Sequence, residues 1–155
     1  MTTREKDLRR LNTAGFITEF GAVSDSVTGF NEVRFVCDHM DSMSPPISWT
    51  FWDHNLIFGD VKYEKELSRA YPRAVAGEIE SFSFDANTSE FTLKYDSGAA
   101  METTEVFLGT AFYPNGTNVS VSPETCCDVK SSGNGVLLIT HHESGVSINV
   151  KVSSL

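Results

Sequence analysis

The hydrophobic pattern of this chain changes at Gly77, and the change limits the folds that the chain can adopt. After Gly77, apolar and polar residues alternate in six short segments: EIESFSF (78–84), EFTLKY (90–95), TEVFLG (104–109), NVSVS (118–122), GVLLITHH (135–142) and GVSINVKV (145–152). Turns rich in asparagine, glycine and serine separate these segments. Alternation with a period of two gives a strand one buried face. The pattern therefore predicts an antiparallel β-sandwich over residues 77–155.

The chain before Gly77 follows a different pattern, with apolar residues spaced for helices and two short apolar runs. A helix is predicted where apolar residues recur at i, i+3, i+4 and i+7, and it should stop before the pair Pro45-Pro46. The expected elements are helix 3–12, strand 16–20, loop 24–29, helix 31–43, strand 47–52 and helix 62–70. This order predicts β/α units with parallel strands. Two such units cannot close a barrel, so residues 1–76 are expected to belong to something larger.

Charge and hydropathy exclude two classes of partner or anchor. The formal net charge of the 155 residues is -9, which disfavours binding to nucleic acid. Nine of the twelve Lys and Arg residues lie before residue 77, which again divides the chain into two compositions. No apolar run approaches the roughly 20 residues that a membrane-spanning helix needs.

The sequence leaves the cellular compartment open. Sequons for N-glycosylation begin at Asn87, Asn115 and Asn118, each in a polar, turn-like context. If they are used, the protein is secreted or resides in an endomembrane or lysosome-like compartment; such triplets also occur by chance and stay unused. Cys126 and Cys127 are adjacent, and neighbouring cysteines rarely pair with each other. No metal-ligand spacing is present, so neither a metal nor a cofactor is expected.

Three segments, in this order, resemble a known family: FITEFGA (16–22), SWTFWD (48–53) and LSRAYPRAVAGEIESFSFD (67–85). They are similar to the C-terminal part of glycoside hydrolase family 5, in its endoglycoceramidase-like and steryl-glucosidase-like branch. One departure is Ala70, where the junction of the family would have a proline. The resemblance implies a (β/α)8 TIM barrel followed by a small antiparallel β-sandwich. Residues 1–76 would supply the last two strands and helices of the barrel, and residues 77–155 the sandwich.

The resemblance assigns the carboxylate of Glu19 as the nucleophile of a retaining mechanism. Active sites of such barrels lie at the C-terminal ends of the strands, where Glu19 is expected. Gly21 would let the backbone turn closely beneath the sugar. The alternative for Glu19, from spacing alone, is an exposed acid at a strand end.

The resemblance also assigns residues that bind the sugar. Trp52 matches an aromatic platform under the sugar ring, since an indole offers an apolar face to C–H groups; its alternative is a core aromatic. Asp53 and His54 would rim the site, or remain solvated loop residues. Trp49 has the opposite strand parity and is expected to pack between barrel and helices.

A retaining glycosidase needs a second carboxyl group as acid/base, and the family carries it in an Asn-Glu-Pro motif. The tripeptide is absent from the sequence, where Asn31-Glu32-Val33 opens a helix instead. We therefore expect the N-terminal portion of the barrel to be missing and the isolated chain to show no turnover. The implied substrate is a glycolipid or other β-glycoside, either a glycosylceramide or a steryl glucoside, and the sandwich could make peripheral membrane contact.

A second hypothesis is a non-catalytic module in which the sandwich binds carbohydrate or protein. Phe112 and Tyr113 would then form a binding strip, although burial under a turn is the stronger expectation for them. The carboxylate of Glu19 favours the enzyme-derived hypothesis, because a module without catalysis has no need of it.

Overall fold

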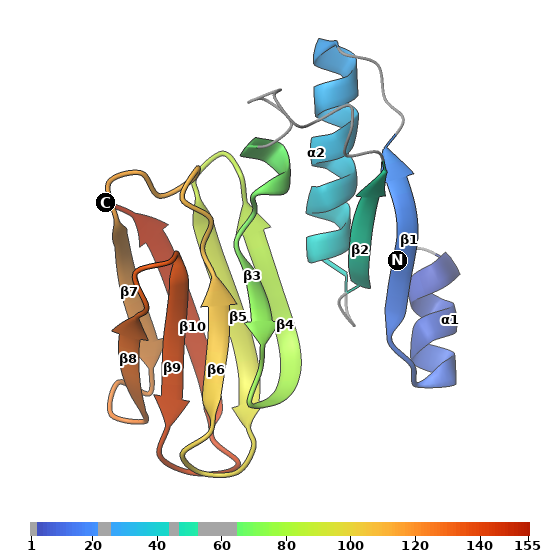
Figure 1. The fold of residues 1–155 in the computed structure, drawn as a ribbon. Helices are drawn as coiled ribbons and strands as arrows, with labels where there is room; N and C mark the ends of the chain where they lie inside the picture. The colour runs from blue at the N-terminus through green and yellow to red at the C-terminus, as the bar shows by residue number, and fades with distance from the viewer. Residues whose placement is uncertain (1–2, 22–25, 44–46, 53–64) are drawn as a thin grey trace. The chain divides into compact units, whose positions relative to one another are not determined.

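A computed structural model describes residues 3–21, 26–43, 47–52 and 65–155 of the chain. The chain divides into two compact units, residues 1–67 and residues 68–155. Figure 1 shows the first unit in blue to green and the second in green to red. No helix in the described part of the chain is long and apolar enough to cross a membrane.

The first unit contains two helices and a two-stranded parallel sheet. Its elements are α1 (Thr3–Leu11), β1 (Gly15–Gly21), α2 (Val27–Asp41) and β2 (Ile47–Trp52). β1 and β2 pair in parallel, and α2 lies between them in the chain. This is the β/α/β order that the sequence predicts. Membership of a barrel remains a prediction, since the described residues of this unit form two strands only.

Helix α2 begins earlier than the sequence pattern predicts. The predicted start was residue 31, and residues 27–29 were expected in a loop, whereas the helix starts at Val27. Ser26 has an extended backbone, and its Oγ accepts a hydrogen bond from the backbone N–H of Gly29 at 3.2 Å. This N-cap satisfies one of the first free N–H groups of the helix, which allows the helix to begin before its apolar face does.

The second unit is built from eight antiparallel strands. They are β3 (Tyr71–Ala74), β4 (Gly77–Asp85), β5 (Glu90–Ser97), β6 (Thr103–Phe107), β7 (Thr117–Ser122), β8 (Cys127–Ser131), β9 (Val136–His141) and β10 (Ser147–Ser154). One sheet has the order β4-β5-β10-β7, and the other has the order β3-β6-β9-β8 (Figure 1). The inward residues of both sheets form one hydrophobic core, which includes Phe91, Tyr95, Val106, Ile139 and Val150. The alternating pattern predicted this arrangement.

Two of the eight strands, β3 and β8, were missed by the alternation pattern. β3 is the short edge strand YPRA, and Pro72 within it has no backbone N–H for a second neighbour. Proline is tolerated in a strand at such an edge. β8 is also an edge strand. Its first residue, Cys127, is partly buried, and its other residues are exposed. An edge strand with little burial has no strong alternation, so the sequence gives little sign of it.

The boundary between the two units lies upstream of the expected position at residues 76 and 77. Arg69 and Ala70 are both buried in the second unit, at 2% and 1% exposure. The predicted helix 62–70 is wrong over residues 68–70, since the helical part ends at Leu67; residues 62–64 lie outside the described residues. β3 then pairs with β6 and joins the sandwich. Tertiary burial thus moves the junction segment into the sandwich.

Candidate active site

Glu19 lies at an irregularity in the pairing of β1 with β2. Ile17 pairs with Trp49 and Phe20 pairs with Phe51, so Thr18 and Glu19 together face Thr50. This two-against-one arrangement is a β-bulge, a feature that is common near active sites and redirects a side chain. The hydroxyl of Thr50 donates a hydrogen bond to the carbonyl oxygen of Thr18 and thereby ties the bulge to β2.

One face of β1 packs against α2, and the side chain of Glu19 lies on the opposite face. Phe20 packs against the small core formed by Val33 and Cys37 of α2. Its ring makes edge contacts with Trp49 and Phe51, each at 5.2 Å between ring centroids. Because neighbouring residues of a strand point to opposite faces, Glu19 is directed away from the helix and is exposed. The predicted packing of Trp49 against the helix is confirmed.

Trp52 ends β2 on the same exposed face as Glu19. Its side chain is 56% exposed, while the alternate residues Trp49 and Phe51 face the helix core. Trp52 is therefore not part of the core that α2 forms with the strands. Gly21 pairs with Trp52 and has φ of +131°, and a Cβ at this position would overlap the carbonyl oxygen of Trp52. The crowding that requires this glycine thus comes from the backbone of β2.

The exposed face presents one candidate nucleophile without a carboxylate partner. Within the described residues, no hydrogen bond or ion pair engages Glu19. Glu32 is the nearby acid of α2, but it lines a separate cavity of about 410 Å³ together with Phe20, Gly21, Val33, Phe35 and Val36. That cavity adjoins the helix core. The arrangement offers a nucleophile and an aromatic surface, and it lacks an acid/base on the described residues.

The other predicted binding residues divide into those outside the described residues and those that are buried. Asp53 and His54 lie outside the described residues, so their roles remain predictions. Phe112 and Tyr113 are 4% and 7% exposed, so they form no binding strip. Burial raises the pKa of Tyr113 to about 12, in keeping with a phenol inside the core. Among the residues described, no group of three or more potential ligands could hold a metal ion.

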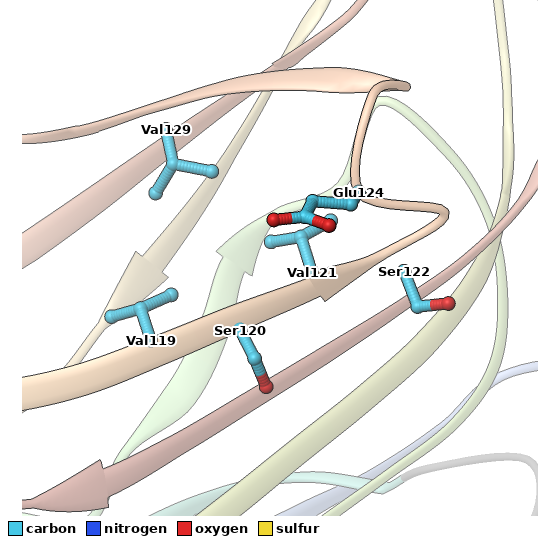
Figure 2. Close-up of a pocket in the computed structure, with 6 residues that line it drawn as sticks. All are labelled: Val119, Ser120, Val121, Ser122, Glu124 and Val129. Carbon is cyan, nitrogen blue, oxygen red and sulfur yellow. The ribbon is translucent and has the colours of Figure 1, made fainter.

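The sandwich contains a second concave site, at the side where its two sheets end in edge strands. Its cavity of about 510 Å³ is lined by Val119, Ser120, Val121, Ser122, Glu124 and Val129, which Figure 2 draws as sticks. The first four of these residues come from β7 and the last from β8. Glu124 belongs to the turn that joins the two strands. No pattern in the sequence indicates this cavity, because the cavity depends on how two edge strands of different sheets lie together.

The first unit is a β/α/β unit that carries an exposed carboxylate and an exposed indole at the ends of parallel strands, and the second is a β-sandwich. Residues 69–152 match the model of the glycoside hydrolase family 5 C-terminal domain. The chain belongs to glycoside hydrolase family 5, as its resemblance predicted. An endoglycoceramidase from Hydra vulgaris is 30% identical over 136 residues, which cover 76% of this chain and 25% of the relative. Endoglycoceramidase I from Rhodococcus hoagii is 30% identical over 122 residues, covering 72% of this chain and 22% of that protein.

Solved structures share the fold of this chain. Endo-glycoceramidase II from Rhodococcus sp. superposes with a TM-score of 0.71 and 21% identity, over 97% of this chain and 35% of that chain. Sterylglucosidase 1 from Cryptococcus neoformans superposes with a TM-score of 0.73 and 13% identity, over 97% of this chain and 31% of that one. The chain therefore spans about a quarter of the curated relatives named above and about a third of these solved structures.

The bulge is the part of the site that sequence reasoning missed. Its signal was present as two consecutive polar residues, Thr18 and Glu19, inside an otherwise apolar run. In a regular strand, one of the two would have to face the helix core. A bulge places both on the exposed face and keeps Ile17 and Phe20 on the inner face.

Proposed function

We propose that this chain supplies the nucleophile-bearing strand and the sandwich of a retaining β-glycosidase that cleaves glycolipids. The observation that carries the proposal is the position of Glu19. Its carboxylate is exposed at a bulge near the end of a parallel strand, on the same face as the exposed indole of Trp52. Barrel enzymes place their catalytic groups at this end of their strands.

In the proposed mechanism, Glu19 attacks the anomeric carbon and forms a covalent glycosyl-enzyme, while the bond to the leaving oxygen breaks. A separate carboxylic acid protonates that oxygen and then deprotonates the water that releases the sugar. The acid/base would come from a barrel portion beyond this sequence. Trp52 would hold the sugar ring by contact with its C–H groups. The seventh and eighth strands of the barrel would be β1 and β2.

The lipid part of the substrate is proposed from the relatives. One solved structure of endo-glycoceramidase II from Rhodococcus sp. is a complex with ganglioside GM3, and another neighbour is a sterylglucosidase. A ceramide or sterol glycoside is therefore the proposed substrate class. The sandwich would make the peripheral membrane contact, through an exposed apolar side chain such as Met101.

The proposal is tested by restoring the barrel. The chain is fused behind the N-terminal barrel portion of endoglycoceramidase I from Rhodococcus hoagii, and hydrolysis of an aryl β-glycoside is measured. Replacing Glu19 with Ala should lower kcat by about 10⁴-fold or more, since the nucleophile is lost. Added azide should restore turnover by taking the nucleophile's place and giving a glycosyl azide of inverted configuration. The matched control is Glu32→Gln, which should leave kcat within about twofold because Glu32 lines the cavity beside the helix core.

Two results would contradict the proposal. A fusion that turns over equally well with Glu19→Ala would remove Glu19 from catalysis. If azide restores no activity to a folded fusion that carries Glu19→Ala, Glu19 is not the nucleophile. The same fusion tests the membrane contact: Met101→Ser should lower the rate on glycolipid vesicles and leave the rate on the aryl glycoside unchanged. An unchanged ratio of the two rates would remove the sandwich from lipid recognition.

A further inference from the structure

The turn between β7 and β8 brings two thiols together. The Sγ atoms of Cys126 and Cys127 lie 2.7 Å apart. The two cysteines are free thiols whose sulfur atoms are in direct contact. The sequence predicted that these neighbours would not pair, since adjacent Cα atoms are closer than in most disulfides. The structure places their side chains toward each other instead.

The backbone on both sides of the thiols is held by hydrogen bonds. The N–H of Cys126 donates to the carbonyl oxygen of Pro123 at 3.2 Å, and the carbonyl oxygen of Cys126 accepts from the N–H of His142 at 2.9 Å. Cys127 is the first residue of β8 and pairs with His141 of β9. The turn is therefore fixed at both ends, and the two sulfur atoms stay close without a bond between them.

The surroundings of the pair are partly buried and contain a basic group. Both thiols pack against the sandwich core. His141 is fully buried, its Nε2 lies 2.7 Å from the carbonyl oxygen of Ala99, and its Nδ1 has no hydrogen-bond partner among the residues described. Cross-strand partners such as Cys127 and His141 carry their side chains on the same face of a sheet. The imidazole of His141 and the thiol of Cys127 therefore lie on the same face of this sheet.

We propose that Cys126 and Cys127 form a redox-active dithiol that closes to a disulfide on reaction with a small-molecule disulfide. One thiol loses its proton and attacks the reagent, which releases one thiol and leaves a mixed disulfide. The neighbouring thiol then loses its proton, attacks the protein sulfur of that mixed disulfide and releases a second thiol. Two electrons pass from the cysteine pair to the reagent. The pair is independent of the glycosidase proposal, because it lies wholly within the sandwich.

Closure of the ring would act on the cavity between the edge strands. Glu124 lines that cavity (Figure 2), and it lies in the turn between β7 and β8 that also contains Cys126. The ring formed by the two sulfur atoms includes the peptide bond between the cysteines, so it would restrict this turn. The oxidation state of the pair therefore would set the mobility of one wall of the cavity.

The test measures the oxidation product directly. The native chain is treated with oxidised glutathione, the remaining thiols are alkylated in denaturant, and the peptide with residues 126 and 127 is weighed. The expected peptide has lost two hydrogens and carries no glutathione, because the second thiol displaces the first adduct. Cys127→Ser should keep a glutathione adduct on Cys126, because no second thiol can displace it. Cys37→Ser should behave like the native chain, since Cys37 is in the other unit.

A native chain that keeps two alkylated thiols, or a stable glutathione adduct, would overturn the proposal. Phenylarsine oxide supplies a second measurement, because trivalent arsenic bridges two neighbouring thiols. The reagent should protect both cysteines of the native chain from alkylation. It should not protect Cys126 in the Cys127→Ser variant, which has only one of the two thiols. Hydrogen exchange of the amides at residues 123–126 should be slower after oxidation. Unchanged exchange would overturn the effect on the cavity wall.

Discussion

Gly77 shows how one residue can decide where the sandwich begins. It has φ of +152°, and a Cβ there would overlap the carbonyl oxygen of Asp96 on β5. The partner of Gly77 in the sheet is Ser97, so β4 starts at the point of closest approach to β5. A glycine is required both by the backbone angle and by this approach.

Gly77→Ala should lower the free energy of unfolding of the sandwich by more than about 2 kcal/mol, because the strained angle and the overlap both oppose the new side chain. The matched control is Gly133→Ala, where φ is +79° and no atom lies within 4 Å of an added Cβ. This control carries the backbone cost alone, about 1 kcal/mol. Urea unfolding followed by circular dichroism measures both. Equal losses for the two variants would show that the approach to Asp96 carries no energy.

The segment between the two units is anchored by a buried arginine. Arg69 is 2% exposed, and its Nη2 donates a hydrogen bond to the carbonyl oxygen of Phe84 at 3.1 Å. Its guanidinium lies 5.0 Å from the centre of the Phe84 ring, which allows a cation–π interaction. The segment thereby joins the sandwich core before β3 begins.

Arg69→Ala should destabilise the sandwich by about 3 kcal/mol, since it removes a charge-assisted hydrogen bond and leaves a cavity. Arg73→Ala is the control in the same segment. Arg73 is 59% exposed and makes a surface ion pair with Glu105 at 3.5 Å, which contributes about 0.5 kcal/mol. Thermal unfolding of both variants gives the comparison. A loss for Arg69→Ala no larger than for Arg73→Ala would contradict the anchoring role.

The elements that the sequence predicted correctly are those with a strong period of burial. β5 and β10 alternate buried with less buried residues along almost their whole length, and their alternation is visible in the sequence. β3 and β8 are edge strands, and their pairing partners rather than their own composition make them strands. The start of α2 depended on a single cap residue, Ser26, which precedes the apolar face.

At the scale of the whole molecule, the three sequons fall on the surface of the sandwich. Asn87 lies in the turn between β4 and β5, Asn115 lies before β7, and Asn118 lies on β7; all three are exposed. We expect the chain to accept N-glycans when it is secreted from a eukaryotic host. Removal of N-glycans by an amidase should increase its electrophoretic mobility. Ser89→Ala, which destroys the first sequon, should remove one glycan and leave the fold intact.

A secreted chain that carries no glycan at any of the three asparagines would contradict this expectation.

The charge of the molecule agrees with an exposed, solvated sandwich surface. After residue 77 there are three Lys residues and no Arg against ten acids, so this unit carries most of the net charge of -9. Such a surface repels nucleic acid and favours solubility.

The sequence by itself determined the two-unit organisation and the sandwich, because periods of burial are local properties of a chain. The candidates Glu19 and Trp52 came from its resemblance to a family. Only the tertiary structure decided which face these residues occupy and how the two cysteines meet. The bulge at Thr18 and Glu19 exists through pairing with β2, and the contact of Cys126 with Cys127 exists through a turn held by β9. Pairing between distant segments sets both, and no local pattern records it.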